Sequence, residues 1–195
     1  MYMPEAVVVI SGASGAQYGV RLLDALLDAG WSINLIVSKA GAINLDLECG
    51  ISPEDLSARD GVTLEDNNNL AARSASGSAR FDAYIVCPAS GTTIGKIASG
   101  ISDNLATRSA LVAMKERRKL ILVPREAPFS TPHLRAMANL SEWGAVILPA
   151  SPGFYHSPKS IEDLIDFVVA RILDQMGVSH DLGRRWTGDE LVSSE

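Results

Sequence analysis

The chain has 195 residues, of which 47% are hydrophobic and 21% charged, as in an ordinary soluble globular protein. The length predicts one domain, and the composition excludes a disordered, collagen-like or coiled-coil protein. The formal charge of −6, from 17 basic and 23 acidic residues, argues against a broad nucleic-acid surface, which needs a basic excess.

The two cysteines, Cys49 and Cys87, stand far apart in the sequence, and neither has a His at the spacing of a metal site. This pattern excludes a disulfide framework and a structural zinc module, and it predicts a reducing compartment. The first apolar run, Ala6 to Ile10, is much shorter than the roughly 20 residues of a membrane span, and no basic segment precedes it. We therefore expect a cytoplasmic protein without a membrane span.

Apolar runs and helical stretches alternate along the chain, which is the pattern of a doubly wound α/β sheet. The predicted strands are Ala6–Ile10, Ile33–Val37, Tyr84–Cys87, Leu120–Val123 and Ala145–Leu148. The predicted helices are Ala16–Ala29, Lys39–Cys49, a short one ending at Gly100, Asn104–Arg118 with cations in its last turn, one starting at Pro132 with Thr131 as its cap, and one running from the cap Ser160 through Leu173. Continuous β-branched runs are typical of parallel strands that are covered on both faces.

Two regions lack this pattern. Residues 50–80 are polar and broken, and we expect an irregular insertion there. Residues 179–195 have the composition of a C-terminal tail, so the domain is expected to span residues 1–178.

Ligands of an open α/β sheet bind beyond the carboxyl ends of its strands, so the loops after the strands are the candidate sites. The first loop, Ser11–Gly15, consists of small residues that let backbone N–H groups approach a phosphate; alternatively, its glycines only permit close packing. The third loop, Pro88–Thr93, again offers hydroxyls and backbone donors. Together the two loops could hold FMN by its phosphate and ring edge, although the third can also be a simple capped turn.

The other two loops carry charge. The second begins with Ser38 and Lys39, where an NAD-binding unit would place an acidic residue, so a pyridine-nucleotide oxidoreductase is disfavoured. The fourth places Arg125 and Glu126 between two prolines. Arg125 suits a phosphate or a flavin ring and Glu126 suits proton transfer, unless the two form only an exposed ion pair.

Further cations lie on the predicted helices. Arg108 and Lys115 are seven residues apart and share one face, which is either a solvated face or part of a phosphate site. Arg171 lies at the margin of an apolar stripe, where it either snorkels or joins Tyr155 in holding a phosphate. His133 has no nucleophile motif near it, so it is not predicted as a triad base.

The chain resembles the UbiX-type flavin prenyltransferases, a flavoprotein family of the flavin-containing cysteine decarboxylase-like fold group. The matching segments are SGASGAQYGVRLLDAL, IVSKA, CPASGTT, LVAMKERRKLILVPREAPFS, GAVILPASPGFYHSPKSIEDLIDFVVARILD and RRW. The combination of PREAP, GFYH and an Arg on the last helix is highly specific. The resemblance implies a flavodoxin-like or Rossmann-like three-layer α/β domain, a homo-oligomer that is a dodecamer built from trimers, and FMN bound between subunits.

The resemblance also implies a reaction. A dimethylallyl group passes from dimethylallyl phosphate to N5 and C6 of reduced FMN, and the prenylated FMN serves a UbiD-type decarboxylase. We expect this transfer to be independent of metal, because a cluster of cations can stabilise the departing phosphate. Two rivals remain: a flavin-dependent decarboxylase of the same fold group, which uses an early His that is not evident here, and a non-catalytic FMN-binding electron carrier or store.

The residue roles follow from the same resemblance. The flavin contacts that match are Gly12, Ala13, Ser14, Ser38, Ser90, Gly91, Thr92, Thr93 and Arg125, and the prenyl-phosphate contacts that match are Tyr155 and Arg171. The catalytic set is Ser14, Glu48, Arg108, Lys115 and Glu126, with no metal ligand. The chain departs from the family at Gly91: the family commonly has PCST where this chain has PASG, so a hydroxyl is missing there.

Overall fold

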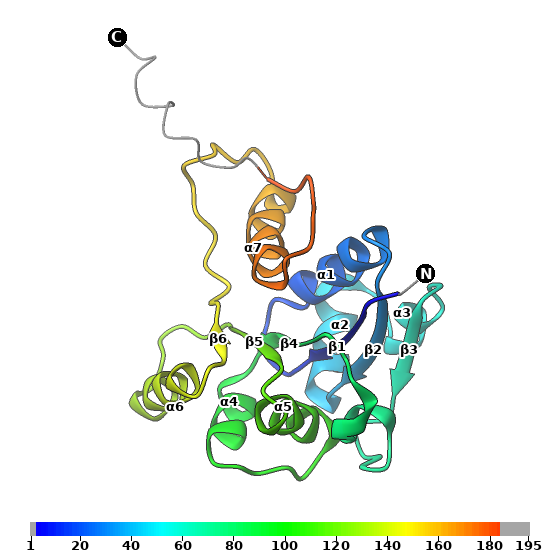
Figure 1. Cartoon of the computed structure of the whole chain (residues 1–195). Coiled ribbons are helices and arrows are strands. Elements are labelled where there is room, and N and C mark those ends of the chain that lie inside the picture. Colours follow the sequence, from blue (N-terminus) through cyan, green and yellow to red (C-terminus); the bar gives the residue numbers. More distant parts are fainter. Residues whose placement is uncertain (1–2, 184–195) are drawn as a thin grey trace.

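The computed structural model describes residues 3–183 as one parallel sheet with helices on both faces (Figure 1). The strands are β1 (Glu5–Ile10), β2 (Ser32–Val37), β3 (Val62–Glu65), β4 (Ala83–Ala89), β5 (Lys119–Pro124) and β6 (Val146–Ile147). The helices are α1 (Ala16–Asp28), α2 (Lys39–Cys49), α3 (Pro53–Ser57), α4 (Gly91–Ala98), α5 (Leu105–Lys115), α6 (Thr131–Glu142) and α7 (Ile161–Met176), with 3₁₀ turns at Arg73–Ala75 and Gly77–Ala79. The expected fold class is confirmed.

The strand order is β3-β2-β1-β4-β5-β6, and every pair is parallel. The chain therefore moves outward from β1 in one direction and then returns to build the other half from β4. Between β1 and β4 the order reverses, and the loops after these two strands diverge to opposite faces. This reversal is where open α/β sheets bind their ligands, because it leaves a crevice at the carboxyl edge.

The sheet is buried on both faces because its central strands carry apolar side chains on both. On β1, Ala6, Val8 and Ile10 pack into a core with α1, α2 and α7, whereas Val7 and Val9 pack into a second core with α4, α5 and α6. Figure 1 shows α1 and α7 on one side of the sheet and α4 and α5 on the other. This two-sided packing explains why these strands read as continuous apolar runs.

Within residues 3–183, five helices begin at polar caps that are encoded locally: α2, α3, α4, α5 and α7. The side chains of Ser38, Ser90, Asn104 and Ser160 each accept a backbone N–H from the first turn of the following helix. Ser160, the predicted cap of the last helix, also forms a capping box with Asp163. Of these helices, α2 and α4 directly follow β2 and β4, so they start at the carboxyl edge of the sheet.

The expectation of an irregular insertion at residues 50–80 is wrong in part. Val62–Glu65 form β3, which pairs with β2 and extends the sheet to a sixth strand, and Pro53–Ser57 form α3 behind a capping box at Ser52. The strand has only four residues and alternates apolar with polar, because one side of an edge strand is open to water. It therefore lacks the continuous apolar run that identified the other strands.

Several predicted boundaries also need correction. β4 runs through Pro88 to Ala89, because a shift in register between Val86 and Ala89 accommodates a residue that has no N–H. α5 ends at Lys115, so the basic residues that follow lie in a turn, with Arg117 at a positive φ of 55°. The cap of α6 is Ser130 rather than Thr131, and β6 is confined to Val146–Ile147.

The chain continues past the last helix to residue 183, and part of it packs on the domain. Gly177 ends α7 at φ 74°, Val178 is buried, and Leu182 packs against the core beside α1 and α7. The proposed boundary at residue 178 stays a prediction, and RRW, at 184–186, lies outside the described residues. Among residues 3–183, no helix is long and apolar enough to cross a membrane.

Candidate active site

Ser11 joins the loops that follow β1 and β4. Its hydroxyl donates to the Pro88 carbonyl at 2.8 Å and accepts the Ser90 N–H at 2.8 Å, while its own N–H also donates to Pro88. Ser11 is only 1% exposed, so these bonds are shielded from water. The crevice at the reversal of strand order is therefore a fixed structure, held by a residue that the sequence reading did not single out.

The first loop lies very close to the start of α2. A Cβ added to Gly12 would stand 2.5 Å from the Ala40 Cβ, and one added to Gly41 would overlap the backbone oxygen of Ile10. The packing interpretation of the first glycine is therefore correct. Gly12 and Ser14 are nevertheless exposed, so the same loop presents backbone and hydroxyl groups outward. Close packing of the loop and exposure of groups that could bind a phosphate are therefore compatible.

Glu48, on the last turn of α2, closes the base of this loop. Its Oε2 accepts the N–H of Gly15 at 2.8 Å and the N–H of Ala16 at 2.7 Å. N–H groups at the start of a helix have no acceptor within the helix itself, and the helix dipole there also favours an anion, so a carboxylate suits this position. The carboxylate is thus held at the carboxyl edge of the sheet by two backbone groups.

Arg125 reaches the same loop from the end of β5. Its Nε donates to the Ser14 carbonyl at 2.9 Å, which leaves the terminal guanidinium nitrogens as further donors. Glu126, the next residue, is exposed. The predicted flavin residues Ser14 and Arg125 are therefore in contact, although 111 positions separate them.

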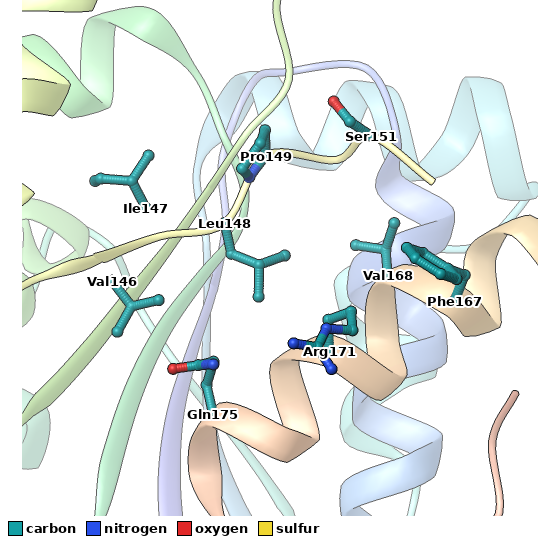
Figure 2. Close-up of a pocket in the computed structure, with 9 residues that line it drawn as sticks. All are labelled: Val146, Ile147, Leu148, Pro149, Ser151, Phe167, Val168, Arg171 and Gln175. Atoms are coloured by element: carbon teal, nitrogen blue, oxygen red, sulfur yellow. The ribbon is translucent and has the colours of Figure 1, made fainter. Parts of the chain in front are cut away.

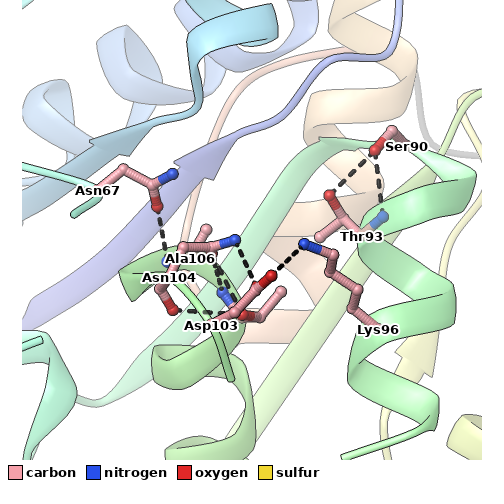
Figure 3. A network of polar contacts seen from close by, with 8 residues as sticks. Asn67, Ser90, Thr93, Lys96, Asp103, Asn104 and Ala106 are labelled. Carbon is pink, nitrogen blue, oxygen red and sulfur yellow. Dashed lines mark hydrogen bonds and ion pairs between the residues drawn. The ribbon is translucent and has the colours of Figure 1, made fainter. Parts of the chain in front are cut away.

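The start of α4 supplies the opposite wall. Figure 3 shows the Ser90 hydroxyl beside Thr93, at 3.3 Å from its N–H and 3.0 Å from its Oγ1. Thr92 is exposed. Farther along α4, Lys96 pairs with Asp103, and Asn67 accepts the Ala106 N–H at 2.9 Å, which ties the segment after β3 to the start of α5.

Gly91 lies against the ring of His133, on the first turn of α6. A Cβ at Gly91 would overlap that ring, and within the described residues the buried Nδ1 of His133 has no hydrogen-bond partner. The departure from the family pattern at Gly91 therefore has a steric cause in this chain: the imidazole occupies the space next to the first residue of α4.

Arg108 and Lys115 share a face of α5, as predicted, and both face the 73–79 segment. Arg108 Nε donates to the Ala75 carbonyl at 3.3 Å, and Lys115 pairs with Glu116 next to Gly77. These contacts lie on a different part of the chain from the Ser14–Arg125 contact. The single chain does not show all the predicted phosphate ligands gathered around one point.

Arg171 lines a pocket of about 280 Å³ between α7 and the segment around β6. Figure 2 shows its side chain next to Val168 and Phe167 of α7, with Leu148 opposite. The Tyr155 ring packs edge-on against Phe167, with centroids 5.8 Å apart. Both predicted prenyl-phosphate residues therefore lie near Phe167: Tyr155 packs against its ring, and Arg171 lines the same pocket.

Comparison with known proteins defines the family. The family model described as Flavoprotein matches residues 3–173. The flavin prenyltransferase UbiX of Pseudomonas aeruginosa is 45% identical over 98% of this chain and 99% of its own length.

This chain belongs to the UbiX family of flavoproteins.

Two solved UbiX-type structures share the whole fold. AnUbiX, crystallised with FMN and dimethylallyl pyrophosphate, has a TM-score of 0.92 and 40% identity, covering 96% of this chain and 99% of its own. A dodecameric FMN-dependent UbiX-like decarboxylase from Escherichia coli O157:H7 has a TM-score of 0.90 and 41% identity, covering 94% and 100%. Both structures therefore match this chain over nearly its full length.

Within this UbiX-family chain, one group of predicted residues is connected by observed contacts. Ser14, Glu48, Ser90 and Arg125 are linked through the loops after β1 and β4, while Ser38 caps α2. The residues that sequence reasoning missed are those that hold this group in place, above all Ser11. Its position directly after a buried strand was the only available signal.

Cysteine and metal chemistry have little support in the described residues. Burial raises the pKa of the Cys87 thiol far above its usual range, so the thiol stays protonated. Residues 3–183 contain no group of three or more His, Cys, Asp or Glu side chains placed to hold a metal ion.

Proposed function

We propose that this chain is a flavin prenyltransferase that moves a dimethylallyl group from dimethylallyl phosphate to N5 and C6 of reduced FMN. The observation that carries the proposal is the match over nearly the whole chain to AnUbiX, a protein crystallised with FMN and dimethylallyl pyrophosphate. The contacts at the carboxyl edge of the sheet supply a physical account of how the residues would act.

The residues at the crevice fit FMN. Gly12, Ser14 and Thr92 are exposed at the starts of α1 and α4, and the terminal guanidinium nitrogens of Arg125 make no hydrogen bond within the described part of the chain. The residues proposed to hold FMN are Gly12, Ala13, Ser14, Ser38, Ser90, Gly91, Thr92, Thr93 and Arg125. Small side chains let backbone N–H groups reach a phosphate or a ring edge. Bound and reduced, FMN supplies the electron-rich ring that receives the dimethylallyl group.

Cations of this chain would stabilise the departing phosphate. Breaking the allylic C–O bond leaves negative charge on the phosphate oxygens, and preorganised Arg and Lys donors stabilise that charge without a metal ion. We assign this role to Arg108, Lys115 and Arg171, with Tyr155 holding the substrate. Because Arg108 and Lys115 face the 73–79 segment and Arg171 lines the α7 pocket, one phosphate would be reached by ligands from neighbouring copies. A dodecamer, the state named for the E. coli relative, would supply them.

Closure at C6 requires loss of a proton, and two carboxylates of this chain are candidates to take it. Glu48 is held through one oxygen by the N–H groups of Gly15 and Ala16, and within residues 3–183 its other oxygen has no hydrogen bond, whereas Glu126 is exposed next to Arg125. A proton acceptor acts best when it is fixed within hydrogen-bond reach of the acidic atom. We therefore favour Glu48.

The test is a single incubation of the purified protein with reduced FMN and dimethylallyl phosphate, without oxygen. The expected product has the mass of FMN plus one dimethylallyl unit and an altered absorption spectrum, and it forms equally in EDTA. A parallel incubation with dimethylallyl pyrophosphate identifies the preferred donor. Unchanged FMN in every sample would contradict the proposal, and a strict need for a divalent ion would contradict metal independence.

Two other functions give different outcomes in the same experiment. An electron carrier or store would bind FMN and leave it unmodified. A decarboxylase, the activity named for the E. coli relative, would release CO₂ from a carboxylic acid without consuming an allylic phosphate. We further propose that the product serves a UbiD-type decarboxylase and that the reaction takes place in the cytoplasm, where the unpaired Cys49 and Cys87 would stay reduced.

A further inference from the structure

Three side chains near the end of α7 form a chain of hydrogen bonds. Arg171 Nη1 donates to Asp174 Oδ2 at 2.9 Å, and the other oxygen of Asp174 lies 3.2 Å from His180 Nε2. The Leu182 N–H donates to His180 Nδ1 at 3.2 Å. Because Nδ1 accepts this bond, a neutral His180 carries its proton on Nε2 and donates it to Asp174. The imidazole is therefore fixed in both position and tautomer.

The exposed fraction of the side chain decreases from Arg171 through Asp174 to His180. The side chain of Arg171 is 54% exposed, that of Asp174 is 20% exposed, and that of His180 is 6% exposed. Arg171 lines the pocket toward β6, whereas His180 lines a separate pocket toward α1, with Arg21, Asp28 and Asp181 around it. The exposed guanidinium is thus linked through Asp174 to a buried imidazole that lines a different pocket.

The stability of α7 alone does not explain why an aspartate stands at position 174. The residue is in the last turn of α7, where the helix dipole disfavours an anion. Gly177, at φ 74°, turns the chain back so that His180 can reach this carboxylate. Two donors from different elements then offset the unfavourable position. An acid placed and held in this way fits a role in orienting Arg171.

We propose that Asp174 and His180 are positioning residues that orient Arg171 toward the phosphate of the prenyl donor. One guanidinium N–H is fixed on Asp174, and the remaining donors face the pocket, where they are preorganised for phosphate oxygens. Neither positioning residue touches the substrate. This inference rests on the proposed function, in which Arg171 binds the phosphate.

The test compares two replacements of His180 that each retain half of its hydrogen bonding. His180→Gln places an amide N–H near the position of Nε2 and can still donate to Asp174. His180→Asn can still accept the Leu182 N–H but is too short to reach the carboxylate. Asp174→Asn removes the charge, and Asp181→Asn, an exposed carboxylate beside the same pocket, is the matched control.

Steady-state rates with dimethylallyl phosphate give KM and kcat, and inorganic phosphate titrated into the FMN-loaded protein gives a dissociation constant that does not depend on turnover. We expect Asp174→Asn and His180→Asn to raise KM and the phosphate dissociation constant roughly tenfold, as for the loss of a hydrogen bond to a charged group. His180→Gln should recover most of this loss. FMN affinity and the Asp181→Asn control should stay unchanged.

The outcomes separate this inference from the proposed function. If Arg171→Lys weakens phosphate binding while Asp174→Asn and His180→Asn do not, or if the latter two lower only the unfolding midpoint, the positioning role is overturned and the function stands. If Arg171→Lys leaves phosphate binding unchanged, the Arg171 guanidinium does not hold the phosphate and the inference is overturned. If phosphate binding follows the expected pattern but no prenylated product forms, the function fails and the positioning role stands.

Discussion

The carboxylate of Glu48 and the backbone N–H of Gly15 are 2.8 Å apart, although 33 positions separate the two residues. A second N–H, from Ala16, donates to the same oxygen at 2.7 Å. This pair closes the first loop of the crevice and places an acid there at the same time. Structural and chemical roles of Glu48 can therefore be separated by substitution.

Glu48→Gln should retain the fold and FMN binding but lose product formation. The amide oxygen can still accept the two N–H groups, whereas it cannot take up a proton. We expect at least a roughly hundredfold lower rate, in line with the loss of a general base. Glu48→Ala should lower stability as well, because two helix-start donors lose their acceptor. Product formation at the wild-type rate in Glu48→Gln would assign the proton to another group.

Ser11→Ala should destabilise the protein and weaken FMN binding together. The substitution removes the hydroxyl that bridges Pro88 and Ser90 and leaves the Ser90 N–H without that acceptor, at a cost of about 1–3 kcal/mol. Chemical unfolding and FMN titration measure the two effects. Ser99→Ala, an exposed serine at the end of α4, is the control. A loss of stability with unchanged FMN affinity would show that the crevice does not depend on the bridge.

Gly91→Ala should displace His133, whereas Gly95→Ala on the same helix should not. A Cβ at Gly91 overlaps the imidazole, and a Cβ at Gly95 meets open space within the described residues. We expect Gly91→Ala to cost about 1–3 kcal/mol through overpacking, and Gly95→Ala to be neutral or to stabilise α4 by up to about 1 kcal/mol. Thermal unfolding of both variants gives the comparison. Adding His133→Ala to Gly91→Ala should restore most of the loss, and failure of this rescue would place the clash elsewhere.

The cap of α7 should weaken in acid. Hydrogen bonds from the N–H groups of Lys159 and Ser160 lower the pKa of Asp163 below its usual value of 3.8. A lowered folded-state pKa means that the stabilisation is fully present above about pH 4 and is lost as the pH falls through the folded-state value. Asp163→Asn should therefore reduce the free energy of unfolding at neutral pH, and its difference from wild type should shrink below pH 4. Glu162→Gln, an exposed acid in the same turn, is the control, and a difference that stays constant with pH would contradict the assignment.

The sequence alone determined the features that depend on near neighbours. Runs such as Ala6–Ile10 identify parallel strands because both faces of the sheet are covered, and caps such as Ser90 and Ser160 act within three residues of their own position. The loops of small residues after β1 and β4 also follow from their position at strand ends. The resemblance to a family then supplied the proposed role of each residue in them.

Only the tertiary structure decided which distant groups meet. β3 is a strand because β2 pairs with it, and no apolar run in Val62–Glu65 indicates this. Ser11 became a bridge, His133 filled the space at Gly91, and His180 reached Asp174, because packing of the sheet and helices brings these groups together. Such contacts depend on how all the strands and helices between the two residues pack. Residue types and spacing therefore predict the edge of the sheet where a site forms, but not the hydrogen bonds that hold its residues in place.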